Sequence, residues 1–357
     1  MKKILGAVAA VAVLAPCHVW AQTTVNIYGR LDASLNYRDY GSTPGVGTKP
    51  GKASSTLSSV SSDTSFWGFR GVEDLGGGLR AYFKMENGFG IDTGAVVSTT
   101  SFFNREAYVG LGDAGLGSIQ LGSQFSPAIA LSAEFDPFQR SNIGGLYTLM
   151  QNSAANLRGF PLKYDNALQY LSPTNNDVVV RAMINAGEGV IPGPNYAASV
   201  KYTKQNLMLG SSYDRNRITS VSVGVSGSTV TSQTLSLTAK YDTSFGSLNA
   251  WAQTNRIPGL SSANGVMLGA TYLMGSSELR ASVARENVGT ARGTLSSLGY
   301  FYLISKRTTL YTSVGHLSNQ GTAVFSMGPS LTEGPPQGLP GKAQGISGVQ
   351  LGMRTFF

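Results

Sequence analysis

The feature that most constrains this chain is the alternation of apolar and polar residues in its last segment. In residues 345–357 (GISGVQLGMRTFF), Leu351 and Met353 fall on one face of an extended chain, and Gln350 and Arg354 fall on the other. A period of two over about ten residues is what a strand needs to cross a membrane between lipid and water. The alternation continues to the last aromatic residue, where the ends of soluble domains usually fray. We therefore expect a transmembrane β-strand at this end.

The rest of the chain points to strands as well. After the N-terminal region, no apolar run approaches the roughly 20 residues that a membrane helix requires. Backbone polar groups in lipid must be paired, and without helices only a closed barrel pairs them all. The 45 glycines, 16 tyrosines and 15 phenylalanines suit a barrel wall with aromatic girdles. A secreted soluble β-protein is the alternative that composition alone leaves open.

Alternating segments separated by turn residues predict sixteen antiparallel strands. The first is the clearest, because a register slip of one residue would move Arg30 and Asp32 into lipid. Fourteen or eighteen strands are also compatible with the pattern, and residues 216–232 are ambiguous. The fold class is thus all-β, a 16-stranded transmembrane barrel. The expected strands are residues 25–37, 64–72, 79–88, 102–112, 117–124, 164–172, 178–186, 196–203, 207–214, 233–241, 247–255, 265–273, 278–286, 296–304, 308–316 and 345–357.

The N-terminus has the pattern of a secretory signal peptide. Lys2 and Lys3 precede an apolar run over residues 4–15, and small residues before Gln22 suit cleavage after residue 21. We expect residues 1–21 to be removed and residues 22–357 to form one barrel domain. Cys17 would be lost with the leader, which leaves no cysteine for disulfide or thiolate chemistry. The remaining 25 basic and 19 acidic residues carry a formal charge of +6.

Two connections are too long for tight turns. Residues 39–61 are polar and rich in Gly, Ser, Thr and Pro, and we interpret them as an extracellular loop. Some forty residues between Gln124 and Lys163 contain no obvious pair of strands. A loop of that length in a compact barrel is usually functional. We expect it to fold into the lumen and narrow it.

Several short segments along the chain carry a resemblance to a known family. They are residues 65–89 (SFWGFRGVEDLGGGLRAYFKMENGF), 26–32 (NIYGRLD), 105–111 (REAYVGL), 135–138 (FDPF) and 305–308 (SKRT). These segments resemble the trimeric general porins of Gram-negative bacteria, especially the β-proteobacterial and neisserial branch. The resemblance spans the chain in the right order, and its implied architecture is three sixteen-stranded barrels, each constricted by an inward-folded third loop. The C-terminal Phe357 resembles the signal read by the outer-membrane insertion machinery.

The resemblance also implies a pore constriction with opposed charges. Its basic wall would contain Arg30, Arg70, Arg105 and a residue near Arg158 or Lys163. Its acidic side would be Glu134 and Asp136 on the third loop. Opposed charges across a narrow lumen create a transverse field that orients polar solutes. Alternatively, these two carboxylates cap the turns of the loop itself or pair locally.

Two departures from the family pattern weaken the basic wall. Phe66 and Ser123 stand where the family often has arginine. Other basic residues, at positions 80, 181, 201, 240 and 280, nevertheless have lumen-facing parity. We expect a weak preference for anions. Alternation places Glu106 opposite Arg105, on the outside of the barrel, where lipid would make a carboxylate costly. A position at a subunit interface or near the rim would keep Glu106 out of lipid, and we expect it in one of these two places.

The predicted function is passive diffusion of small hydrophilic solutes and ions through a water-filled channel in the Gram-negative outer membrane. A substrate-specific porin is the alternative, followed by a barrel enzyme. His316 is the one histidine outside the leader and has no acidic neighbour in sequence, so catalysis has thin support. No metal or cofactor motif is found, and we expect neither. The expected partners are two further copies in a homotrimer, outer-membrane lipid and lipopolysaccharide, and the insertion machinery. We expect no nucleic acid, because the basic residues are scattered.

Overall fold

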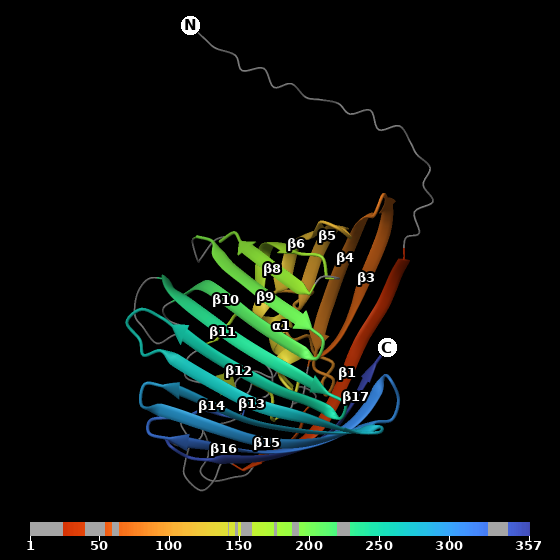
Figure 1. Ribbon diagram of the computed structural model, residues 1–357. Coiled ribbons are helices and arrows are strands. Elements are labelled where there is room, and N and C mark those ends of the chain that lie inside the picture. The colour runs from red at the N-terminus through yellow and green to blue at the C-terminus, as the bar shows by residue number, and fades with distance from the viewer. Residues whose placement is uncertain are drawn as a thin grey trace.

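A computed structural model describes residues 24–39, 54–58, 64–141, 143–146, 149–150, 159–174, 177–187, 193–219, 229–327 and 342–357. The predicted leader, residues 1–21, lies outside these ranges. Within them, seventeen strand segments form one antiparallel sheet that closes on itself because β1 pairs with β17 (Figure 1). Closure leaves no sheet edge exposed to lipid.

The strands follow one another around the barrel in chain order. The segments are β1 (Thr24–Asp39), β2 (Ser54–Ser58), β3 (Ser65–Gly76), β4 (Leu79–Phe89), β5 (Glu106–Asp113), β6 (Gly117–Phe125), β7 (Lys163–Leu171), β8 (Val178–Asn185), β9 (Asn195–Lys204), β10 (Leu207–Thr219), β11 (Thr229–Thr243), β12 (Gly246–Arg256), β13 (Ala263–Met274), β14 (Ser277–Val288), β15 (Ala291–Leu303), β16 (Thr308–Gln320) and β17 (Ile346–Phe356).

The barrel has sixteen strand positions, which confirms the predicted number. β2 and β3 occupy one position together, since β3 pairs with Thr24–Arg30 of β1 and β2 pairs with Ser34–Arg38. The short β2 lies in a stretch that the sequence assigned entirely to a loop. The strand expected from residue 102 begins at Glu106 instead. In the ambiguous region, β10 extends to Thr219 and β11 begins at Thr229.

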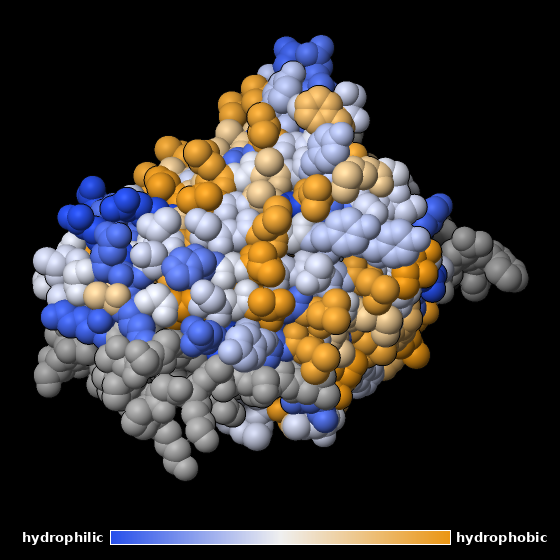
Figure 2. Space-filling view, turned by 90° about the horizontal axis from the view of Figure 1, so that it is seen from below, coloured by the Kyte–Doolittle hydropathy of each residue, from blue (hydrophilic) through white to orange (hydrophobic). Residues whose placement is uncertain are grey.

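Alternation along each strand sorts side chains between the outer surface and the lumen. On β13, for example, Leu268 is 68% exposed and its neighbour Met267 is 1% exposed. Space-filling representation shows apolar patches across the outer face in view (Figure 2). An exposed apolar surface of this extent suits a lipid environment and would be an aggregation hazard in water. Among the described residues, no helix has the length and apolar character needed to cross a membrane.

The two ends of the barrel differ in their connections. At one end, tight turns such as Gln205–Asn206 and Gly275–Ser276 join successive strands. The other end carries the described connection from β4 to β5 and the long connection between β6 and β7. The last residue closes the seam at the tight-turn end, where Phe357 exchanges backbone hydrogen bonds with Gly29 at 3.2 and 3.3 Å. A side chain on Gly29 would meet the Phe357 ring, so only glycine fits this close approach.

The described helix lies inside the ring of strands (Figure 1). It is α1 (Pro127–Phe135), and it belongs to the long connection between β6 and β7. Ser126 is its N-cap and accepts a hydrogen bond from the Ile129 backbone N–H, while Pro127 stands in the first turn, where its missing N–H costs nothing. The connection therefore folds inward, as the sequence predicts.

An apolar cluster fixes this connection to the inner wall. Buried side chains of α1 and of the segment after it, including Phe135, Leu146 and Leu149, pack against wall residues such as Trp251 and Leu295. Seven glycines with inward parity make room for it, and we call them the glycine track. They are Gly210, Gly265, Gly269, Gly293, Gly299, Gly315 and Gly348, and an added Cβ at each would contact Leu131, Phe135, Pro137, Phe138, Ile143, Leu149 or Met150 of the connection.

Candidate pore constriction

The long connection between β6 and β7, which we call the third connection, packs on one side of the barrel. It leaves a water-accessible cavity on the other side. The cavity has a volume of about 850 Å³ and lies between α1 and the wall. Its charged lining residues are Arg30, Lys84, Arg105, Glu106, Arg140, Lys163, Asp165 and Arg181, and α1 contributes Ile129, Ala130 and Ala133.

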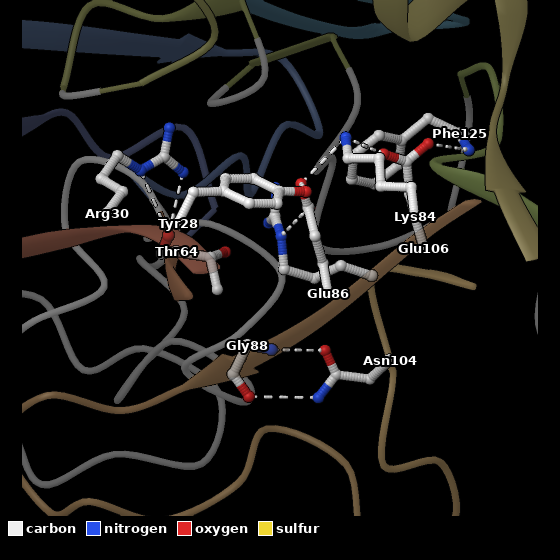
Figure 3. Close-up of polar contacts among 10 residues, drawn as sticks. Tyr28, Arg30, Thr64, Lys84, Glu86, Gly88, Asn104, Glu106 and Phe125 are labelled. Carbon is white, nitrogen blue, oxygen red and sulfur yellow. Dashed lines mark hydrogen bonds and ion pairs between the residues drawn. The ribbon is translucent and has the colours of Figure 1, made fainter. Parts of the chain in front are cut away.

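The wall side of the cavity is organised by five residues, which we call the charged network: Tyr28, Lys84, Glu86, Arg105 and Glu106 (Figure 3). The Lys84 Nζ lies 2.9 Å from a Glu86 oxygen and 2.5 Å from a Glu106 oxygen. The Arg105 Nε donates to the other Glu86 oxygen at 3.0 Å, and the Tyr28 hydroxyl donates to Glu86 at 2.8 Å. Two cations and two carboxylates therefore compensate each other, as buried charges must.

Glu106 corrects an expectation from the sequence. Alternation from Arg105 onward placed its side chain outside the barrel, but it is 7% exposed and faces the lumen. The reason is that β5 begins at Glu106, which pairs directly with Glu86 of β4. Arg105 precedes the strand, so strand alternation does not apply between the two residues, and both reach the same network. The carboxylate also accepts the backbone N–H of Phe125 at 3.3 Å.

Arg105 is positioned by the residue before it and by contacts of its guanidinium. Just before it, Asn104 exchanges two hydrogen bonds with the backbone of Gly88, at 3.0 and 3.1 Å (Figure 3). The Arg105 guanidinium lies 4.4 Å from the ring centre of Phe66 and 5.2 Å from that of Phe125. These cation–π contacts hold the guanidinium face and leave its edge for hydrogen bonds.

Arg30 shares one of these rings. Its guanidinium lies 5.1 Å from the centre of Phe66, and its Nη2 donates to the Thr64 carbonyl at 2.9 Å. Phe66, which stands where the family often has arginine, is therefore an aromatic spacer between two arginines. The structure brings Arg30 and Arg105 together at the cavity.

The other predicted basic residues have different places. Arg70 is exposed on β3, with its guanidinium 4.7 Å from the Tyr28 ring centre, and lies outside the cavity lining. Lys163 borders the cavity but is held at the start of β7, where its Nζ lies 2.8 Å from Asp165 and 3.1 Å from the Ser123 hydroxyl. Arg158 lies outside the described residues.

The two predicted acidic residues are both engaged locally. The Glu134 carboxylate on α1 accepts two hydrogen bonds from the Lys201 Nζ, at 2.8 and 2.9 Å. Asp136 is 2% exposed and accepts backbone N–H groups of Phe138, Arg140 and Leu146. Burial raises the pKa of Asp136 to about 6, against the opposing effect of these three donors. Asp136 thus matches the alternative in which it caps a turn of the loop itself, and it does not face the cavity.

Sequence reasoning did not single out Lys84, Glu86 or Tyr28. A signal was available, since residues 84 and 86 share parity with Arg80, which the pattern assigns to the lumen. Arg181 was recognised only by this parity, and it lines the cavity. Arg140 gives no periodic signal. It follows α1 in a left-handed backbone conformation, with φ at 64°.

Comparison with known proteins agrees with this architecture. A family model described as Gram-negative porin matches residues 7–322. Outer membrane porin protein 32 of Delftia acidovorans is 26% identical over 382 aligned residues, which cover 100% of both chains. An outer membrane porin protein of Bordetella pertussis is 32% identical over 184 residues, or 49% of this chain and 45% of the relative.

Solved structures show the same fold. The anion-selective porin from Comamonas acidovorans superposes with a TM-score of 0.80 at 23% identity, over 94% of this chain and 100% of that one. The trimer form of OmpT from Vibrio cholerae gives a TM-score of 0.63 at 15% identity, over 94% and 99% of the two chains.

The closed barrel with an apolar outer surface, a charged cavity and an inward-folded connection defines an outer-membrane β-barrel channel. This chain belongs to the Gram-negative porin family. It is an outer-membrane protein that forms a channel for passive diffusion of small hydrophilic solutes. The family is one of channels, and the predictions of fold, class and location are confirmed.

Proposed function

We propose that this channel is constricted between α1 and the charged network, and that it weakly prefers anions. One observation carries the proposal, namely the sign of the charges at the cavity. Six lining residues are basic (Arg30, Lys84, Arg105, Arg140, Lys163 and Arg181) and two are acidic (Glu106 and Asp165). A lumen with low-dielectric walls concentrates ions of the opposite sign, so excess positive charge favours anions.

The third connection does not offset this excess. Lys201 neutralises Glu134, and Asp136 is turned into the connection itself. The charged network is internally balanced, which keeps the preference weak. The structurally similar porin from Comamonas acidovorans is anion-selective, which supports the same sign.

The deciding experiment is planar-bilayer recording of the purified protein in a KCl gradient. We expect large ohmic conductance steps and a reversal potential on the anion side. A reversal potential on the cation side would contradict the proposed preference. Absence of conductance would contradict the open cavity and favour the alternative of a barrel enzyme. We propose no enzymatic activity.

The proposed assembly is a homotrimer through the outer wall of β3–β6. This wall carries an apolar concavity of about 590 Å³, lined by Phe83, Val109, Leu111 and neighbouring side chains. Trp67 packs edge-on against Phe69 and Phe102 beside it. Aromatic clusters of this kind are typical of obligate interfaces. Native mass spectrometry in detergent tests the stoichiometry, and voltage-induced closure in thirds is the matching electrical result.

A second outer surface suits lipopolysaccharide. Five arginines face outward near the loop end of β10–β15, namely Arg215, Arg217, Arg256, Arg285 and Arg292, and within the described part of the chain none forms an ion pair. Arginine binds phosphate groups bidentately, and the loop end reaches the headgroup layer. Replacing Arg256 and Arg285 with Gln would lower the amount of phosphorylated glycolipid that copurifies with the protein.

Two further proposals concern export. We propose that residues 1–21 are a cleaved signal peptide and that Phe357 is read by the outer-membrane insertion machinery. The position of Phe357 at the seam, outside the lumen, is compatible with that role. N-terminal sequencing of the outer-membrane form should begin at Gln22. Phe357→Ala should lower the amount inserted.

A further inference from the structure

The cavity has two chemically unlike sides. The wall side carries the charged network, whereas the α1 side is apolar. Ala130 and Ala133 are three residues apart on α1 and therefore share a face, which is accessible to the cavity. The half-buried side chain of Leu162, at the end of the connection, extends this apolar side.

On α1 itself no uncompensated charge interrupts the apolar side, and the polar lining residues Gln139 and Arg140 follow only after the helix ends. Glu134 is the one carboxylate of α1, and the Lys201 ammonium group binds both of its oxygens. A solute that crosses the cavity therefore passes a surface of methyl groups on one flank. On that flank, hydroxyl groups would give up water without gaining hydrogen-bond partners.

The opposite flank offers hydrogen-bond donors of fixed orientation. The Arg105 guanidinium uses its Nε for Glu86 and its face for two aromatic rings. Its two terminal amino groups make no hydrogen bond to any described residue. Arg181 lines the same cavity and likewise has no ion pair among the described residues. A guanidinium edge of this kind matches a carboxylate.

We propose that the pore favours small organic carboxylates with an apolar body over equally large carboxylates that carry hydroxyl groups. The carboxylate passes along Arg105 and Arg181 while the apolar body passes along Ala130 and Ala133. This inference rests on the proposed anion preference and names the class of anion that benefits from it. Orientation by one charged and one apolar flank is the usual arrangement of a selective site.

The test compares cyclohexanecarboxylate with shikimate in bilayer recordings at pH 8, with potassium as the common cation. Both have a six-membered ring and one carboxylate, but shikimate also has three hydroxyl groups. We expect the permeability ratio, taken from reversal potentials against chloride, to exceed the ratio of the aqueous mobilities about two- to five-fold.

Two variants locate the effect. Ala130→Ser combined with Ala133→Ser adds hydroxyl groups to the apolar side with little change in size, and should bring the ratio close to that of the mobilities. Ala114→Ser, on the exposed turn between β5 and β6, is the matched control and should leave the ratio unchanged. The trimer band on a gel establishes that each variant is folded.

The outcomes distinguish a failure of this inference from a failure of the proposed anion preference on which it rests. If potassium permeates better than chloride, the anion preference itself is overturned. If chloride is preferred over potassium but the permeability ratio of the two carboxylates equals the ratio of their aqueous mobilities, only the inference about the apolar flank is overturned. Retention of the full ratio in the double serine variant overturns it as well.

Discussion

The two halves of the lumen wall obey the same strand alternation but have opposite surroundings. Inward side chains of β1–β8 supply the charged network and the wall side of the cavity. The wall of β10–β17 is covered in large part by the third connection, which there contacts the glycine track and apolar residues such as Trp251 and Leu295. Alternation therefore sets which side chains point inward, and the third connection determines which of those face water. The cavity therefore lies on the side of the lumen that the third connection leaves open.

The largest effect is expected from weakening the packing of the third connection against the wall of β10–β17. Phe135 is completely buried between α1 and the wall, so Phe135→Ala should remove about 3–5 kcal/mol of packing and cavity energy. We expect α1 to leave the wall part of the time, with higher and noisier conductance. Single-channel recording and hydrogen exchange at α1 measure this change. Leu116→Ala, on an exposed turn, is the control and should leave both unchanged.

Filling the glycine track should have a smaller effect of the same kind. A Cβ on Gly269 would lie 2.5 Å from the Pro137 ring, so Gly269→Ala must displace one of them, at a cost of about 1–3 kcal/mol. Conductance should change, because the connection shifts toward the cavity. Gly115→Ala, where the nearest atom is 3.4 Å away, provides the comparison. Equal behaviour of the two variants would contradict the role of the track.

The charged half can be tested by removing one cation. Arg105→Gln leaves the buried Glu86 with Lys84 as its remaining cationic partner, at a cost of about 1–3 kcal/mol. The reversal potential in a KCl gradient should move toward cation preference. Lys163→Gln is the matched variant, since its partner Asp165 is 64% exposed and the pair contributes less than about 1 kcal/mol. A larger shift from Lys163→Gln would place the constriction elsewhere.

The smallest effect is expected at the boundary between the halves. Glu134→Gln releases Lys201 from its partner, which adds positive charge to the lumen and should strengthen anion preference slightly. The pair is partly exposed and screened by water, so unfolding in urea should change by about 1 kcal/mol or less. A shift toward cations would show that Glu134 and Lys201 do not act as a pair.

Prediction from sequence succeeded where periodicity governs the structure. The sixteen strand positions and the inward parity of Arg30 and Arg181 follow from side chains that alternate on a pleated chain. It failed where a strand begins, because alternation cannot be extended from Arg105 to Glu106 across the start of β5. Asp136 shows a different limit, since the sequence left open a constriction role or a turn cap, and no spacing in an irregular turn decides between the two.

Because of the glycine track, the number of strands sets the diameter of the barrel but does not by itself set the width of the free passage. The diameter of the frame depends on sixteen paired strands, whereas the free passage depends on how deeply the third connection is seated against the wall. Single substitutions on either partner can therefore retune the opening without rebuilding the frame. A change on one partner must then be matched by a change on the other if the same opening is to be kept.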